Sequence, residues 1–494
     1  MKSYMLREIR QGYNWLKKQA VKCCEKGQVE ESIIRVEQLC AVGNQLTWIY
    51  DDKDLSDLMD VLSVRMLGKS SEMEKAEKKN VVFFDQFGKS FILALQYLYA
   101  LAEAGYYIRY ILSDYVKADP SVFIFEELKH YPNIEIFVIP LEWSYKQRAE
   151  EILRLTLDFM PEKLFLHVKA FSAFNIVIPA LPKECIKYYI DLQDHAMWIR
   201  NNQIDYVIPY RKFGATIDIE KRHFRKDQVL LIPYYPIVRN IPFRGFPDGL
   251  DDKVIIFTGG EFYKTISDDN AYWRLVAKVL EENPNAVVLY AIKGNSFEKL
   301  RDKYMKIPES VADRLIPLGF RNDINEVFKH CDIYLGTSPM SGGLMSQYAA
   351  FNSKPILQYY PKSLSSNNET EQVLNFNGSK EISFTDERMF LIEAKRLIED
   401  VSYRKSKGEA INRCLITKEQ FDKLLCKTIE TNVSQVPFKL QSINYNALTD
   451  WWFSLEKTGI THCRKYILSI LDGYSRLIMP KSYLGAVLHG FFVH

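Results

Sequence analysis

The chain has 494 residues, 47% of them hydrophobic and 26% charged, a balance typical of a globular protein with more than one core. The 65 Lys and Arg residues and the 62 Asp and Glu residues leave a net charge of +3, so we expect no nucleic-acid partner. The eight cysteines are scattered and form no CxxC pair, which argues against a disulfide scaffold and a zinc module.

The first residues, MKSYMLREIR, are charged throughout and lack the apolar stretch of a signal peptide. No apolar run approaches the roughly 20 residues that would span a bilayer. We therefore expect a cytoplasmic protein.

Residues 1–75 predict a helical N-terminal extension, because apolar residues recur at helical spacing over 33–40 and over 55–62. At 81–85 the pattern changes to VVFFD, a short apolar run that ends at polar residues. Further strands are predicted at 108–112, 134–139, 163–168, 186–190 and 206–208, with helices over 90–105 and 145–159. This alternation predicts a Rossmann-like domain over 76–240.

The segment 232–250 is rich in proline and glycine and predicts a connection between domains. The alternation then resumes, with strands predicted at 254–257, 286–291, 315–318, 333–335 and 355–358 and helices over 270–282, 297–305, 324–330 and 345–351. We interpret 251–400 as a second Rossmann-like domain and 401–494 as a helical tail. The predicted fold class is α/β, with two Rossmann-like domains that face a cleft.

Ligands of parallel sheets bind beyond the carboxyl ends of the strands, so residues just after each strand are the candidates for a site. In the second domain, Gly259 and Gly260 follow a predicted strand and Lys264 adds a charge suited to an anion, although a plain turn is equally compatible. Arg321 follows another strand and suits a phosphate, or else it bonds Asp323 at the surface.

The strongest pattern in the second domain is the loop after 333–335, where Ser341, Gly342 and Gly343 precede a helix. The free N–H groups at a helix start predict a diphosphate site, with Gln347 one turn further on to reach a ribose. A purely structural loop is the alternative.

In the first domain, Asp85 and Gln86 follow the strand at 81–85. The GKS that comes next is no P-loop, because Phe83 stands where that motif needs glycine. His167 ends the strand at 163–168 and is a candidate for the same site, or a structural histidine.

The loop after 186–190 carries a histidine between acids, with Asp191 and Asp194 before His195. Such carboxylates orient an imidazole and tune it toward general-base chemistry, with Asp194 as a second proton acceptor. The alternative is that His195 only caps a helix beginning at Ala196.

Together these residues resemble GT-B glycosyltransferases, because the phrase from Arg314 to Leu357 looks like their donor-binding half. Within that superfamily the chain is most similar to bacterial cell-surface polysaccharide glycosyltransferases, whose D-H-x-F-W motif resembles DHAMW at 194–198, and more distantly to O-GlcNAc-transferase-like and HMW1C-like enzymes. The resemblance implies a donor diphosphate held by Lys264, Arg321, Ser341, Gly342 and Gly343, with His195 at the reacting centre.

One departure from the family pattern concerns two glutamates, eight positions apart, that many retaining members carry. These positions hold Pro339 and Gln347 here, which favours an inverting mechanism. The resemblance implies transfer of a hexose-type sugar from a nucleotide-diphosphate donor, UDP-sugar first, to a hydroxyl of a glycan, lipid-linked or protein acceptor in cell-surface polysaccharide synthesis. We expect no metal and no cofactor.

Two other functions stay open on the same plan: an epimerase or phosphorylase, and a non-catalytic scaffold that supports an active glycosyltransferase. The tail adds a hypothesis of peripheral membrane contact on the inner face of the plasma membrane. There, basic residues alternate with aromatic ones, namely Lys465, Arg476 and Lys481 with Trp451, Trp452, Phe453, Tyr474 and Tyr483. Packing of the tail across both domains is the alternative.

Overall fold

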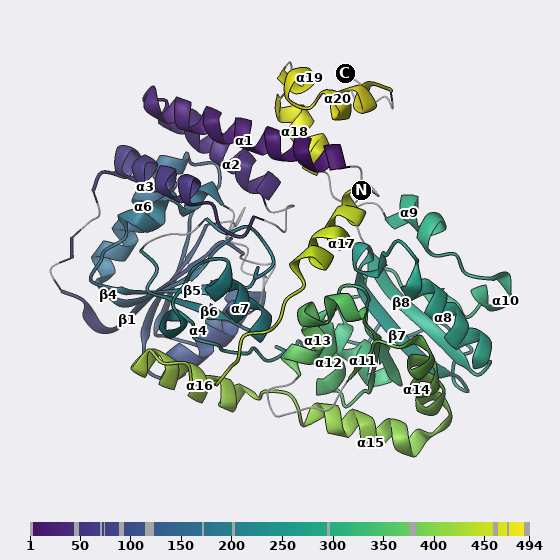
Figure 1. The fold of residues 1–494 in the computed structure, drawn as a ribbon. Helices are drawn as coiled ribbons and strands as arrows, with labels where there is room; N and C mark the ends of the chain where they lie inside the picture. Colours follow the sequence, from purple (N-terminus) through teal and green to yellow (C-terminus); the bar gives the residue numbers. More distant parts are fainter. Residues whose placement is uncertain are drawn as a thin grey trace. The chain divides into compact units, whose positions relative to one another are not determined.

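The computed structural model describes residues 3–43, 49–69, 72–73, 75–87, 93–113, 123–169, 172–199, 203–293, 297–374, 382–457, 463–471 and 474–488. The GKS at 88–90 lies outside these residues. The chain forms two compact units. The first comprises Met1–Ile232, Phe421–Leu440 and Thr461–His494, and the second comprises Pro233–Gln420 and Gln441–Ile460. Each unit contains one parallel six-stranded sheet with helices packed around it (Figure 1).

The sheet of the first unit has the strand order β3-β2-β1-β4-β5-β6. Its strands are β1 (Glu77–Asp85), β2 (Tyr107–Leu112), β3 (Ile134–Val138), β4 (Pro161–His167), β5 (Ile186–Asp191) and β6 (Tyr206–Pro209). The helices between them are α4 (Ala94–Glu103), α5 (Phe123–Leu128), α6 (Tyr145–Phe159) and the 3-10 helix η2 (Ala173–Ala180). Helix α7 (Lys212–Glu220) and the 3-10 helix η3 (Lys226–Gln228) follow the last strand.

Both faces of this sheet are buried, which explains why its strands are apolar runs rather than alternating patterns. In β1, Val82 and Phe84 belong to a core that includes Ile152 of α6. On the other face Phe83 stacks on Phe165, with ring centroids 6.0 Å apart. Asp85, His167 and Asp191 are the last residues of β1, β4 and β5.

The sheet of the second unit has the order β12-β11-β10-β7-β8-β9. Its strands are β7 (Val254–Glu261), β8 (Ala286–Lys293), β9 (Leu315–Pro317), β10 (Ile333–Leu335), β11 (Ile356–Tyr359) and β12 (Ser383–Phe384). Its helices are η4 (Phe262–Thr265), α8 (Ala271–Glu282), α9 (Phe297–Tyr304), α10 (Glu309–Ala312), α11 (Ile324–His330), α12 (Gly343–Phe351), η5 (Lys362–Asn367), α13 (Glu369–Val373), α14 (Glu387–Glu399), α15 (Val401–Asn412) and α17 (Tyr445–Lys457).

The remaining helices of the first unit come from both ends of the chain. They are α1 (Ser3–Glu25), α2 (Val29–Gly43), α3 (Lys53–Leu67), α18 (Cys463–Leu471), α19 (Ser475–Ile478) and α20 (Pro480–Leu488), and α16 (Lys418–Thr431) joins them from residue 421 on. Glu8 of α1 accepts hydrogen bonds from the backbone N–H groups of Lys481 and Ser482, each 2.8 Å long, and so caps α20. In the described part of the chain, no helix is both long enough and apolar enough to cross a membrane.

The predicted fold class is confirmed as two Rossmann-like sheets, and all eleven predicted strands are present. The strand predicted to end at Phe257 continues to Glu261, so Gly259 and Gly260 lie within β7. The two-residue strand β12 was not predicted. The predicted tail 401–494 is divided between the two units. Residues 401–420 and 441–460 belong to the second unit, and residues 421–440 and 461–494 belong to the first.

Candidate functional site

The strand order of each sheet identifies where a ligand binds. Both sheets follow the doubly wound order in which two central strands are neighbours although their connections run in opposite directions. In sheets of this order, the loops after the two central strands diverge, and the carboxyl edge between them is the usual ligand site. The central pairs are β1 with β4 in the first unit, and β7 with β10 in the second.

In the first unit, this position holds a buried aspartate and histidine. Asp85 ends β1, and His167 lies directly opposite it at the end of β4. Asp85 Oδ1 lies 2.9 Å from His167 Nδ1, and Asp85 Oδ2 accepts a 2.6 Å hydrogen bond from the Tyr110 hydroxyl. The backbone N–H of Phe87 also donates to Asp85 Oδ1. The carboxylate therefore fixes the orientation of the imidazole through Nδ1.

The second polar side chain of this position is Gln86. Its Oε1 accepts a hydrogen bond from the backbone N–H of Lys169, and its backbone N–H donates to the His167 carbonyl oxygen. Neither Gln86 Nε2 nor His167 Nε2 has a hydrogen-bond partner among the described residues, although both atoms are buried. The structure thus brings Asp85, Gln86 and His167 together as predicted from strand ends.

His195 lies in the loop after β5, beside a strongly paired carboxylate. Asp194 is buried and accepts two hydrogen bonds from Arg211, from Nε at 2.5 Å and from Nη2 at 2.8 Å. Burial raises the pKa of the Asp194 carboxyl, but the charge and hydrogen bonds of Arg211 outweigh burial and hold that pKa well below its usual value. His195 Nδ1 lies 3.5 Å from Asp194 Oδ1, and its side chain is 33% exposed.

This arrangement separates the roles of the two residues. Asp194 stays ionised and committed to Arg211, so it is poorly suited to take a proton and better suited to orient His195. The alternative in which His195 caps a helix from Ala196 is wrong, because residues 192–199 form a loop. His195 is the more accessible imidazole, since His167 is only 1% exposed.

A buried ion-pair network holds the loop that carries His195. The guanidinium of Arg222 contacts Asp191 at 2.7 Å and Asp218 at 2.9 Å, and it donates to the backbone carbonyl oxygens of Gln193 and Ala196. Burial raises the pKa of Asp191, and burial together with the Asp191 charge raises the pKa of Asp218 well above its usual value. Asp191 therefore takes part in the network that holds this loop, and its own role in a site stays a prediction.

In the second unit, the loops after β7 and β10 meet. Lys264 Nζ lies 3.4 Å from the carbonyl oxygen of Ser341, and the backbone N–H of Met340 donates to the Lys264 carbonyl oxygen. Gly343 begins α12, as predicted. A half-buried ammonium group therefore lies next to the N-terminus of a nine-residue helix, and both features favour an anion.

Gly259 and Gly260 have structural reasons of their own. A Cβ at Gly259 would lie 3.2 Å from the Ala291 carbonyl oxygen and 3.3 Å from the Met345 side chain, so glycine lets β7 approach both β8 and α12. Gly260 has a φ of +137°, which residues with side chains rarely adopt. Their role in donor binding stays a prediction.

Sequence reasoning missed Glu369, an acidic residue at this position. The backbone N–H of Glu369 donates to Ser341 Oγ at 2.7 Å, and its carboxylate lies so close to Gly343 that a Cβ there would clash with it. Tyr234 donates a hydrogen bond to Glu369 Oε1. Glu369 comes ten residues after the end of β11. A search of the residues directly after each strand therefore could not find it.

Arg321 has partners other than the Ser341 loop. It is buried, with Nε 2.7 Å from Asp323 Oδ1 and Nη2 2.6 Å from Asp323 Oδ2, and Nη1 donates to the Gly245 carbonyl oxygen. The bond to Asp323 matches the alternative given for this arginine, except that it is buried rather than at the surface. Its role as a diphosphate ligand stays a prediction, and Lys264 is better placed for it.

Gln347 is fully buried on α12, with Nε2 donating to the Tyr234 carbonyl oxygen at 2.7 Å. Next to it, the Tyr348 hydroxyl donates to the Ile237 carbonyl oxygen. Gln347 therefore ties the segment after residue 232 to α12. An ionised carboxylate at position 347 could not make this bond, because it has no hydrogen to donate.

In the described part of the chain, no three His, Cys, Asp or Glu side chains gather in a way that could hold a metal ion. The expectations of no metal and no cofactor remain predictions. The polar side chains at the carboxyl edges of the two sheets offer hydrogen bonds, and Lys264 adds an ammonium charge in the second unit.

No protein-family model matches the chain, and no curated protein matches it either. Among solved structures, a mutant of the O-GlcNAc transferase from Thermobaculum terrenum is similar to 90% of this chain and 85% of its own, with a TM-score of 0.51 and 12% identity. HepE from Anabaena, in complex with UDP and glucose, is similar over 71% of this chain and 99% of its own, with a TM-score of 0.50 and 14% identity. These identities show the fold alone. At that level the resemblance to GT-B glycosyltransferases is confirmed.

The hydrogen bond of Gln347 gives a first prediction. Gln347→Glu places a carboxylate against the Tyr234 carbonyl oxygen in a buried site and should destabilise the second unit by about 3 kcal/mol. We expect a fall of several degrees in the midpoint of thermal unfolding, measured by calorimetry. Gln420→Glu is the matched control, because exposed Gln420 uses only Oε1, as an acceptor from the Thr417 N–H. An unchanged midpoint in Gln347→Glu would contradict the assigned role.

Proposed function

We propose that this protein is a glycosyltransferase that moves a hexose-type sugar from a nucleotide-diphosphate donor, UDP-sugar first, to an acceptor hydroxyl. The observation that carries the proposal is the meeting of Lys264 with the Ser341 loop at the start of α12. It lies at the strand-order reversal of the second sheet, where this fold binds ligands. The fold shared with an O-GlcNAc transferase and with HepE, solved with UDP and glucose, supports it.

On the donor side, the departing diphosphate gains negative charge as the bond from the sugar carbon to its oxygen breaks. Lys264 and the N–H groups at the start of α12 stabilise that charge without rearrangement. Glu369 provides a carboxylate beside the same loop, and we assign it the ribose hydroxyls, in place of Gln347. Gln347 keeps its bond to Tyr234 instead.

On the acceptor side, His195 takes the proton of the attacking hydroxyl, whose oxygen forms the new bond to the sugar carbon. Asp194, held ionised by Arg211, orients the imidazole and stabilises its protonated form. Asp191, Asp85, Gln86 and His167 line the carboxyl edge of the first sheet, where we place the acceptor. We propose inversion at the sugar carbon, since no carboxylate stands at position 339 or 347.

The donor site is tested by nucleotide binding. Lys264→Met should weaken UDP binding at least about tenfold, because an ammonium next to a diphosphate contributes more than 1.4 kcal/mol. Isothermal titration calorimetry with UDP, GDP, CMP, ADP and dTDP measures this and identifies the base. Lys306→Met is the matched control, since Lys306 is exposed in the same unit. Equal UDP affinity in the two variants would remove Lys264 from the site.

The general base is tested by turnover. His195→Ala should leave UDP affinity unchanged and lower kcat about 100-fold, as loss of a general base does. His167→Gln is the companion variant, because glutamine can still donate to the buried Asp85 carboxylate. Full activity in His195→Ala together with loss in His167→Gln would move the base to His167.

The two rival functions predict different behaviour of the same preparation. An epimerase would interconvert nucleotide sugars without any acceptor, and a phosphorylase would need inorganic phosphate. A non-catalytic scaffold would bind none of the five nucleotides, and the search would move to a partner glycosyltransferase.

We further propose that the protein acts in the cytoplasm, in cell-surface polysaccharide synthesis, on an acceptor at the inner face of the plasma membrane. The structure narrows the surface concerned, since Trp451, Trp452 and Phe453 pack within the second unit. The hypothesis now rests on α19 and α20. There Leu477 is 73% exposed and Leu484 is 59% exposed. Helices α18 to α20 carry four Arg or Lys and, among their described residues, no Asp or Glu.

Vesicle flotation tests this surface. The full chain should float with vesicles containing anionic lipid and not with neutral ones, and Leu477→Asp with Leu484→Asp should abolish flotation. Val433→Asp is the control, because Val433 is 58% exposed elsewhere in the first unit. If the parent protein and all variants float to the same extent, the membrane hypothesis is contradicted.

A further inference from the structure

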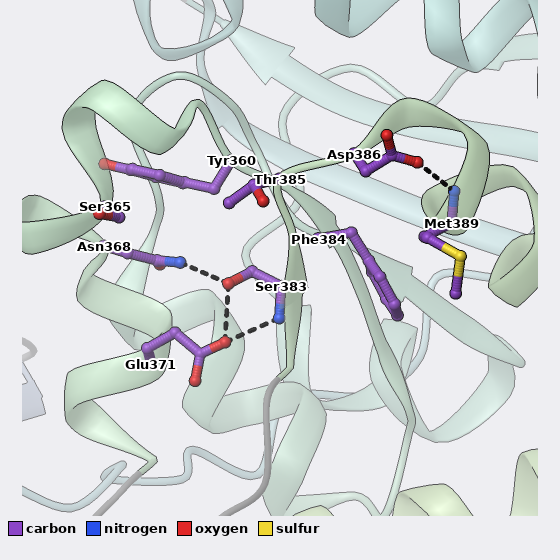
Figure 2. Close-up of a pocket in the computed structure, with 9 residues that line it drawn as sticks. All are labelled: Tyr360, Ser365, Asn368, Glu371, Ser383, Phe384, Thr385, Asp386 and Met389. Atoms are coloured by element: carbon purple, nitrogen blue, oxygen red, sulfur yellow. Dashed lines mark hydrogen bonds between the residues drawn. The ribbon is translucent and has the colours of Figure 1, made fainter.

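A second pocket lies at the carboxyl edge of the second sheet, beyond the Ser341 loop. It opens between the loop after β11 and the residues of β12 and α14, and its volume is about 400 Å³. This size lies within the range of small-ligand pockets. Figure 2 shows its lining, which consists of Tyr360, Ser365, Asn368, Glu371, Ser383, Phe384, Thr385, Asp386 and Met389.

A hydrogen-bonded cluster forms one wall of this pocket. Glu371 Oε1 accepts hydrogen bonds from the backbone N–H and the hydroxyl of Ser383, both at 2.7 Å, and from the Ile382 N–H at 2.8 Å. Ser383 Oγ in turn accepts a 2.8 Å bond from Asn368 Nδ2. These bonds set the amide of Asn368 in one orientation, with Oδ1 turned away from Ser383.

Asn368 is itself incompletely satisfied. Its side chain is nine-tenths or more buried, and Oδ1 has no hydrogen-bond partner anywhere in the described part of the chain. A buried carbonyl oxygen without a donor costs free energy that a ligand hydroxyl would recover. Asn368 lines the pocket, so a ligand hydroxyl that reached Oδ1 would meet an acceptor that has no donor.

The lining also decides the charge of that molecule. Two carboxylates, Glu371 and Asp386, are among the nine lining residues, and Lys, Arg and His are not. A phosphate or a diphosphate would meet only negative charge here. The remaining groups are hydroxyls and the rings of Tyr360 and Phe384, which suit a molecule with many O–H donors and an apolar C–H face.

We propose that this pocket binds a neutral glycosyl unit, a pyranose whose hydroxyls donate to Asn368 and the carboxylates while its C–H face packs on an aromatic ring. The site goes beyond the proposed transfer, because neither Lys264 nor Ser341 lines it. It is nevertheless adjacent to the donor loop. Residue 369, which follows Asn368, bonds Ser341 through its backbone N–H.

Saturation-transfer NMR on the full chain tests the pocket, with glucose, galactose, N-acetylglucosamine and maltotriose as probes and inorganic phosphate as the charged comparison. We expect saturable binding of at least one neutral sugar without any nucleotide, and none of phosphate. Two variants remove the site in different ways. Thr385→Trp fills the pocket from an exposed position, and Asn368→Leu removes the amide.

Both variants should weaken the sugar at least about tenfold, and Thr385→Trp should keep the UDP affinity of the parent protein. Arg388→Ala is the control, because Arg388 is exposed on α14 and does not line the pocket. The proposal is overturned if no neutral sugar binds, if Thr385→Trp binds it as well as Arg388→Ala does, or if sugar and UDP binding are lost together in Thr385→Trp. If the parent protein does not bind UDP, the proposed transfer is contradicted, but the result on sugar binding is not affected.

Discussion

The reversal of strand order at the centre of each parallel sheet is the constraint on which both candidate sites depend. The chain leaves each strand at its carboxyl end. To begin the next parallel strand it must cross over one face of the sheet, and this crossover covers that face. At β1 and β4, and again at β7 and β10, successive crossovers go to opposite sides. The covering helices therefore leave the carboxyl ends of the two central strands uncovered. Polar side chains can gather there without disturbing the apolar core.

The polar residues of the first edge are held by paired charges rather than by apolar packing. Burying an ion is costly unless a partner and further hydrogen bonds compensate it. Arg222 meets this requirement with two carboxylates and two backbone carbonyl oxygens, and Arg211 does so with Asp194. Compensation is incomplete at Asp218, because one guanidinium bonds two acids and Asp218 Oδ2 has no hydrogen-bond partner among the described residues. This support holds the loop of His195, whose imidazole stays partly exposed.

Much of the fold could be predicted because buried parallel strands are short apolar runs that stop at polar residues. The same rule located Asp85 and His167, which proved to be opposite each other across β1 and β4. What could not be predicted depends on distant partners. Gln347 bonds a carbonyl 113 residues earlier in the chain, and Arg321 bonds that of Gly245. Local sequence patterns do not predict hydrogen bonds between residues so far apart in the chain. The strand β12 is two residues long and gives no periodicity.

Gln347 and Glu369 both bond to one residue of the segment that follows residue 232. In α12 the buried side chain at position 347 must donate to the Tyr234 carbonyl oxygen, which glutamate cannot do while ionised. The same tyrosine donates its hydroxyl to Glu369, so one residue of the connecting segment bonds both side chains. A carboxylate is thus present beside the Gly-Gly loop, but it comes from α13 and approaches from the side of Gly343. A negative group at this point opposes a diphosphate unless a cation offsets it, and Lys264 supplies an ammonium next to the same loop. Under the proposed function, the ammonium holds the phosphates, and the carboxylate binds the hydroxyl groups of the donor.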